Sequence, residues 1–149
     1  MPTRTYHDPL HQSISLNSIN PAEEMVMELI DSTPFQRLRR IKQLGPAYLT
    51  FHGAESSRFT HSLGVFHIAR RAINHLSEID SRLKEHKFIL YAAALLHDLG
   101  HGPLSHTSEE IFKITHAEWT RKLINEIQDI SIILNSYGKG TAKAITVLI

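Results

Sequence analysis

Hydrophobic residues recur at helical spacing through the middle of the chain. Between positions 59 and 76 they fall at i, i+3 and i+4 intervals, which places side chains on one face of an α-helix. The residues predicted to share that face are His61, Val65, Ile68, Ala69, Ala72, Ile73 and Leu76. The pattern therefore predicts a long helix with an apolar face that includes a histidine.

A second segment, Lys87 to Leu96, is apolar at nearly every position. This composition predicts a helix that is buried on all sides, and the glycines at 100 and 102 with Pro103 predict its end. Two more helices are predicted at 105–112 and 116–127, the latter with Trp119, Leu123 and Ile127 in register.

Start signals for helices also occur in the N-terminal third. Asn20-Pro21 followed by Glu23 and Glu24 is typical of an N-cap, a proline at the first helical position and an acidic first turn. Thr33-Pro34 repeats the signal, and we predict that this helix continues through "FQRLRRIKQLG" to Gly45. The stretch "LHQSISL" alternates weakly and predicts a short strand or hairpin. The predicted fold class is all-α with a short N-terminal strand or hairpin.

Composition narrows the class of protein. The chain of 149 residues suits a single domain over 1–149 and has no cysteine, which excludes disulfides and thiolate metal sites. Its 16 Lys and Arg against 15 Asp and Glu give a net charge of +1, so a nucleic-acid partner is not expected. No apolar run is long enough to span a bilayer and no signal-peptide pattern is visible. We therefore expect no membrane association and a cytoplasmic location.

Candidate chemistry begins where the buried helix ends. His97-Asp98 follows the apolar segment directly, and His61 lies on another apolar face. Imidazole and carboxylate ligands suit Mn, Fe, Zn or Mg-like ions. The alternative is a set of hydrogen-bonded core side chains, which we favour for His61 taken alone and disfavour for the His-Asp pair.

Four further residues form a second group: His101, His106, Glu109 and His116. Each alone could be a helix cap or a solvated side chain, but four within sixteen positions favour a shared site for proton transfer or phosphate binding. The basic run Arg37, Arg39, Arg40 and Lys42 is typical of a solvated helix face. Arg58, three residues before His61, is the exception and suits a phosphate contact.

The joined segments "SRFTHSLG", "HDLGHGPLSH" and "HAEWT" resemble the signature of HD-domain phosphohydrolases, specifically the deoxynucleoside triphosphate triphosphohydrolase branch. The similarity runs from "DPLHQSISL" to "HAEWTRKLI" and covers most of this chain, but only the front part of the family's catalytic domain. It implies an HD-domain helical bundle, a nucleotide substrate and one divalent metal ion.

The resemblance also implies roles for individual residues. His61, His97 and Asp98 match metal ligands, and Arg58 matches a phosphate-contacting arginine. Gln43 and Leu44 match a pair that contacts the deoxyribose. The positions around the scissile phosphate are matched by His101, His106, Glu109 and His116, with His106 and Glu109 as the acid-base pair.

Two departures from the family pattern stand out. Ser56 occupies a position where many relatives have histidine, and the family's fourth metal ligand, a downstream aspartate, has no counterpart, since Asp129 follows His116 too closely. Together with the apolar end "AITVLI", this predicts a truncated catalytic domain, a homo-oligomer and weak hydrolysis by the 149-residue chain.

The predicted function is metal-dependent hydrolysis of dNTPs to deoxynucleoside and triphosphate. The alternatives are hydrolysis of another phosphate ester, as by a phosphodiesterase or nucleotidase, and a non-catalytic nucleotide- or metal-binding module.

Overall fold

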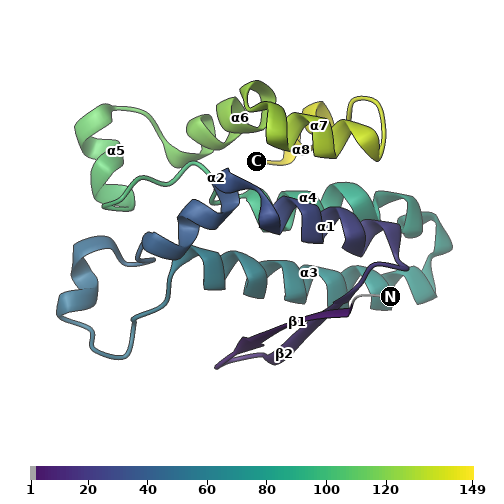
Figure 1. Ribbon diagram of the computed structural model, residues 1–149, viewed down its shortest axis with the longest axis horizontal. Helices are drawn as coiled ribbons and strands as arrows, with labels where there is room; N and C mark the ends of the chain where they lie inside the picture. The colour runs from purple at the N-terminus through teal and green to yellow at the C-terminus, as the bar shows by residue number, and fades with distance from the viewer. Residues whose placement is uncertain (1–2) are drawn as a thin grey trace.

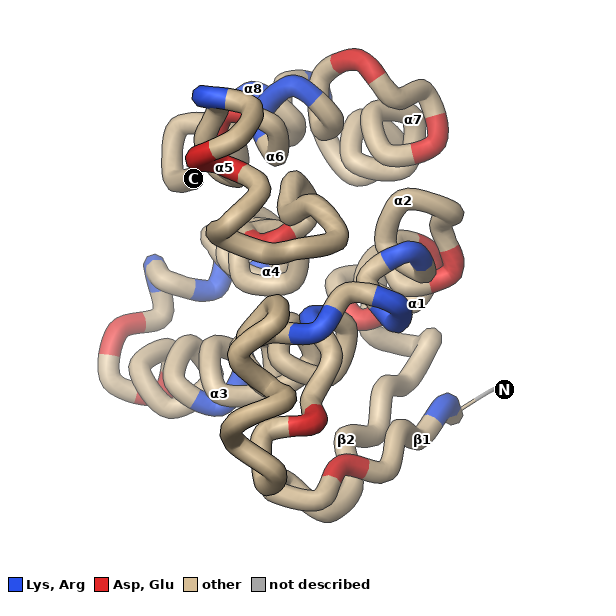
Figure 2. Tube along the Cα trace, turned by 90° about the vertical axis from the view of Figure 1, so that its left-hand side faces the viewer, with Lys and Arg blue, Asp and Glu red and all other residues tan. Residues whose placement is uncertain are grey.

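The computed structural model describes residues 3–149 and consists of two helical layers with a β-hairpin at one side (Figure 1). One layer contains α1, α3 and α4, and the other contains α6, α7 and α8; viewed end-on, α1 and α4 lie on the side of their layer that faces the other (Figure 2). The helices are α1 (Pro21–Asp31), α2 (Thr33–Gln36), α3 (Arg58–Ile79), α4 (Lys87–Leu96), α5 (His106–Phe112), α6 (His116–Glu126), α7 (Gln128–Ser136) and α8 (Thr141–Leu148). Short 3-10 helices are η1 (Arg37–Arg40), η2 (Gly45–Leu49) and η3 (Ser81–His86).

The N-terminal hairpin pairs β1 (Thr3–Asp8) with β2 (Gln12–Asn17) in antiparallel register. In β2 the side chains of Ile14 and Leu16 are buried in the core while their neighbours are exposed, which is the alternation expected of a strand with one covered face. The predicted fold class, a helical domain with a short hairpin, is confirmed.

The helix starts behave as their sequence signals predict, but one helix is much shorter than predicted. Asn20 caps α1 by accepting a hydrogen bond from the Ala22 amide. The helix predicted to reach Gly45 instead gives way to η1 and ends at Arg40. The reason is a competing long-range pairing, since the carbonyl of Ile41 accepts from the Arg58 amide at 2.8 Å and draws the backbone into an extended form.

The predicted apolar face of α3 is wrong for most of its members. The buried residues of α3 include Phe59, Leu63, Phe66 and Ile73, whereas Ile68 is about half exposed. Phe66 packs edge-on against Tyr91 of α4, with 5.3 Å between ring centroids. Because two stripes of α3 have helical spacing, periodicity alone could not identify which one α4 covers.

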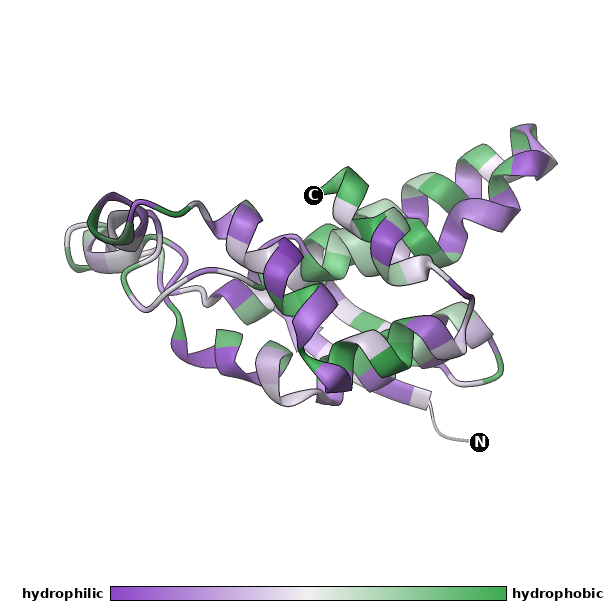
Figure 3. Cartoon of the chain, turned by 90° about the horizontal axis from the view of Figure 1, so that it is seen from above, coloured by the Kyte–Doolittle hydropathy of each residue, from purple (hydrophilic) through white to green (hydrophobic). Residues whose placement is uncertain are grey.

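The helix predicted at Lys87–Leu96 is confirmed as α4, and it is buried from Tyr91 onward except at Ala94, whereas its first turn is only partly buried. Helices α7 and α8 were not predicted. Their many isoleucines and threonines disfavour helix locally, and burial of Ile130, Leu134 and Ile145 supplies the compensating packing. In α8, Val147 and Leu148 remain 78% and 62% exposed, and hydrophobic colouring extends to this end of the chain (Figure 3). Among residues 3–149, no helix is both long and apolar enough to cross a membrane.

Candidate metal and catalytic site

His61, His97 and Asp98, here called the His-Asp triad, converge on one point. The Nε2 atom of His61 lies 3.7 Å from Oδ2 of Asp98, and Nε2 of His97 lies 3.4 Å from Oδ1. His61 comes from the first turn of α3 and the other two from the end of α4. The predicted convergence is therefore present, while the role of these side chains as metal ligands stays a prediction.

The donor atoms of the triad fit a divalent cation. One atom from each residue lies within 4.8 Å of the others. Nδ1 of His97 lies 2.9 Å from the carbonyl oxygen of Ala94, and donation to that oxygen leaves Nε2 with its lone pair directed into the site. Burial lowers the pKa of His61, which favours the neutral imidazole that binds metals.

Arg58 is buried against the triad. Its Nη1 donates to Oδ2 of Asp98 at 2.6 Å, and Nη2 donates to the carbonyl of Gln43 and to Oγ of Ser105. Burial would raise the pKa of Asp98, but the neighbouring His101, His97 and Arg58 lower it below its ordinary value. Asp98 is thus a carboxylate at neutral pH, and Arg58 is held by protein acceptors around it.

His101, His106, Glu109 and His116, here called the histidine cluster, meet beside the triad. Oε1 of Glu109 lies 2.9 Å from Nδ1 of His106 and 2.8 Å from Nδ1 of His116. Burial would raise the pKa of Glu109, but the hydrogen bonds from His116 and His106 lower it. An ionised Glu109 therefore accepts from both imidazoles and directs their Nε2 atoms away from itself.

His101 connects the two groups. Its ring is 1% exposed and stacks on His116 with 4.1 Å between centroids. Nε2 of His101 lies 3.3 Å from Oδ1 of Asp98, and Nδ1 lies 3.9 Å from Oε1 of Glu109. The triad and the histidine cluster are consequently parts of one continuous site.

Long-range hydrogen bonds fix the loop after α4. Arg37 is exposed, but it donates to the carbonyls of Leu99 and His101 at 2.5 and 2.8 Å, so this member of the basic run also has a structural role. The Gly100 amide donates to Oγ1 of Thr120 at 2.8 Å, which ties the loop to α6. These partners lie 20 to 64 positions apart in the sequence, so no local pattern could have predicted them.

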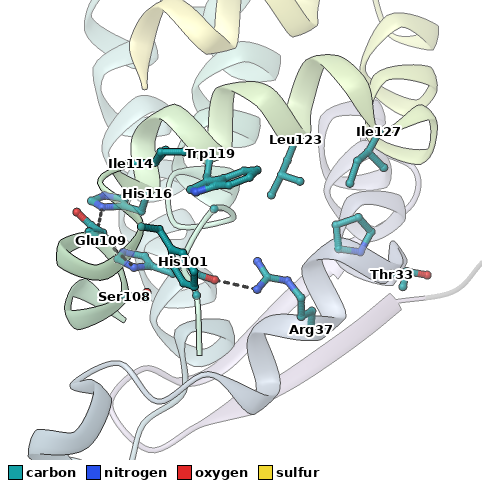
Figure 4. A pocket seen from close by; sticks show the side chains of 14 residues that line it. Thr33, Arg37, His101, Ser108, Glu109, Ile114, His116, Trp119, Leu123 and Ile127 are labelled. Atoms are coloured by element: carbon teal, nitrogen blue, oxygen red, sulfur yellow. Dashed lines mark hydrogen bonds and ion pairs between the residues drawn. The ribbon is translucent and has the colours of Figure 1, made fainter. Parts of the chain in front are cut away.

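Two grooves flank the site. The first has a volume of about 620 Å³. In Figure 4 the apolar side chains of Trp119, Leu123 and Ile127 lie along one side of it, with Arg37 below. The polar side chains of His101, Glu109 and His116 lie at one end. The second, about 640 Å³, is lined by residues that include Gln43, Ser56 and His61. Ile68 and Val65, from the stripe predicted to be buried, line this second groove.

Gln43 and Leu44, the predicted sugar-contacting pair, lie in different surroundings. Gln43 lies in the second groove, its side-chain oxygen accepts from Oγ of Ser56 at 3.0 Å, and its carbonyl accepts from Arg58. Leu44 is partly exposed and lines neither groove. Ser56, the departure from the family pattern, therefore acts here as a hydrogen-bond partner of Gln43.

The helical fold with its short N-terminal hairpin is consistent with an HD domain. The HD domain family matches residues 58–143, more than half of the chain. The chain belongs to the HD domain family.

Particular relatives include bacterial and vertebrate proteins. The chain is 43% identical over 141 residues to the uncharacterized protein YwfO of Bacillus subtilis, covering 92% of this chain and 31% of that protein. It is 38% identical over 134 residues to deoxynucleoside triphosphate triphosphohydrolase SAMHD1 of Danio rerio, covering 88% and 20%. The human SAMHD1 protein is 41% identical over 106 residues, covering 69% and 16%. The chain thus spans less than a third of the length of these relatives.

Proposed function

We propose that this domain carries out metal-dependent hydrolysis of nucleotide phosphate esters, and specifically that it converts dNTPs to deoxynucleoside and triphosphate. The observation that carries the proposal is the contact between the two groups at Asp98 and His101, which brings a set of metal-binding donors beside a set of proton-transfer groups. Similarity to SAMHD1 proteins, which are named deoxynucleoside triphosphate triphosphohydrolases, supports the choice of substrate.

In the proposed reaction the His-Asp triad would hold a divalent cation, which would supply electrophilic polarisation of the phosphate and a nucleophilic water. Arg58 keeps Asp98 ionised and oriented through the 2.6 Å contact. Water is added across the bond between the α-phosphorus and the 5′ oxygen, so the hydroxyl remains with triphosphate and a proton must reach the 5′ oxygen.

The histidine cluster supplies that proton. Glu109 accepts hydrogen bonds from Nδ1 of His106 and of His116, which leaves Nε2 of each ring as the atom available for proton transfer. His106, the more exposed of the two at 66%, is the proposed acid toward the leaving deoxynucleoside. Gln43, held in place through Arg58 and Ser56, is proposed to contact the sugar from the second groove.

The test separates chemistry from metal binding. We expect His106→Ala or His116→Ala to lower dNTP turnover by about 10²- to 10⁴-fold, the usual contribution of general acid-base catalysis, while the manganese bound by the triad is retained. Turnover is followed by the appearance of deoxynucleoside, and manganese by elemental analysis. His75→Ala, a change of an exposed histidine on the far part of α3, is the control that leaves both unchanged. Loss of the triad's manganese in the His116 variant would contradict the assignment of these roles.

A further inference from the structure

We propose that the histidine cluster is itself a second transition-metal site, distinct from the His-Asp triad, and that zinc bound there inhibits hydrolysis. The evidence for this second site is the geometry of the histidine cluster. Its inhibitory effect rests on the function proposed above.

The four donor atoms are arranged closely enough to share one ion. One atom from each of the four residues lies within 4.8 Å of the others. From Oε1 of Glu109, the nearest imidazole nitrogens of His116, His106 and His101 are at 2.8, 2.9 and 3.9 Å. Tetrahedral zinc with bonds of about 2.0 Å needs its ligands roughly 3.3 Å apart. The three separations from Glu109 bracket this value.

His101 provides an independent reason to expect a ligand. Its ring is 1% exposed, and its Nδ1 atom has no hydrogen-bond partner within residues 3–149. Buried polar atoms normally have partners. Nδ1 faces Glu109, the shared member of the cluster, at 3.9 Å, and an ion bound among the four side chains would satisfy this atom.

The donor set selects the kind of metal. Three imidazoles and one carboxylate suit Zn, Co or Ni, whereas Mg prefers oxygen ligands. The triad has two imidazoles and one carboxylate, so nitrogen makes up a smaller share of its donor atoms than in the histidine cluster. The chain has no cysteine to compete for zinc. Magnesium is therefore not expected at the cluster.

The site is open to ions from solvent. The side chain of His106 is 66% exposed, and those of Glu109 and His116 are partly exposed, so entry requires no movement of α5 or α6. Figure 4 shows Glu109 and His116 together at the end of the first groove.

Zinc at this site would remove the proton-transfer function. A ring of His106 or His116 that is coordinated through Nδ1 has its proton on Nε2 and no lone pair left to accept another, so it cannot alternate between proton donor and proton acceptor. Glu109 would be coordinated at the oxygen that orients both rings. Metal binding at the histidine cluster and proton transfer by the same side chains would therefore exclude each other.

The test is metal stoichiometry in the 149-residue chain, prepared without a histidine tag and stripped of metal. Cobalt(II) titration followed by visible absorption, with elemental analysis after gel filtration, should give two equivalents. The double variant His106→Ala with His116→Ala should lose one of the two cobalt equivalents. Its affinity for that ion should fall by more than the roughly 10- to 100-fold that is typical when a residue only hydrogen-bonded to a metal ligand is changed. His61→Ala with His97→Ala should remove the other. The matched control, His75→Ala with His86→Ala, changes two exposed histidines outside both groups and should retain two equivalents.

Circular dichroism establishes that each variant is folded. A single equivalent in the wild-type chain, or two in the folded His106 and His116 double variant, would overturn the second site. Added zinc should also inhibit the manganese-loaded wild-type chain as the second equivalent binds, and unchanged hydrolysis at full occupancy would overturn the inhibitory role. Complete absence of hydrolysis before zinc is added would contradict the proposed function, whereas the stoichiometry would still decide the site.

Discussion

Arg58 and Asp98 form an ion pair in which the two side chains are only 5% and 4% exposed. Taking both charges out of water is costly, and the pair is tolerated because each has further polar neighbours. Removal of one partner leaves the other as an uncompensated buried charge.

For this reason we expect Arg58→Ala to lower the free energy of unfolding of the metal-free chain by about 3–5 kcal/mol. Urea denaturation followed by circular dichroism provides the measurement. Arg82→Ala, which removes an arginine from an exposed pair with Asp80, serves as the control and should leave the urea midpoint close to that of the wild type. Equal effects of the two substitutions would show that the buried pair does not stabilise the site.

The same pair predicts a pH dependence. The pKa of Asp98 in the folded chain is below its ordinary value of 3.8, so the unfolded chain binds more protons at mildly acidic pH. The stabilisation is therefore present above about pH 4 and is lost as the pH falls toward the folded-state pKa. We expect the metal-free wild-type chain to lose stability more steeply between about pH 5 and pH 3 than Asp98→Asn does. Parallel slopes in urea denaturation would contradict the lowered pKa.

At the residue scale, the sequence predicted which side chains would gather but not what holds them. His61, His97 and Asp98 could be found because an apolar segment ends in a His-Asp pair. Arg37 and Ser105 were missed because their contacts are long-range. Arg37 binds carbonyls of the loop after α4, and Ser105 contacts Arg58 from a backbone with φ of +55°.

At the scale of elements, the position of α6 depends on a close approach to the loop after α4. A Cβ atom at Gly100 would lie 2.3 Å from the carbonyl oxygen of His116 and 2.4 Å from the amide nitrogen of Thr120. Both are backbone atoms, which cannot rotate away. Glycine at position 100 is therefore what allows His116 to reach Glu109.

We expect Gly100→Ala to destabilise the chain by at least about 1–3 kcal/mol, the usual cost of overpacking, because α6 must shift. Thermal denaturation is the measurement, and Gly53→Ala is the matched control, since a Cβ atom there would meet nothing within 4 Å. The control should be within about 0.5 kcal/mol of wild type. A Gly100 variant as stable as the Gly53 variant would show that α6 is not held in this position.

Element types were predictable where local signals agreed with tertiary packing. The Asn20 cap of α1 and the apolar run of α4 are examples, and both are present as predicted. The prediction failed where a distant partner decided the outcome. Ile41 pairs with Arg58 instead of continuing a helix, and α4 covers the Phe66 face of α3 instead of the predicted stripe.

At the scale of the whole molecule, acidic and basic residues are distributed over both layers (Figure 2), in line with the small net charge. The His-Asp triad has three members within residues 3–149, and three protein ligands are sufficient for a catalytic metal. Self-association stays a prediction, supported by the exposed Val147 and Leu148 of α8.

The proposed reaction breaks the bond between the α-phosphorus and the 5′ oxygen of a dNTP. It is tested most directly by phosphorus NMR of a dNTP incubated with the manganese-loaded chain, since the identity of the product reports the bond broken however slow the reaction. We predict that tripolyphosphate accumulates together with deoxynucleoside, and that neither forms with Asp98→Asn. Orthophosphate or pyrophosphate as the first product, or no product above a manganese-only blank, would contradict the account.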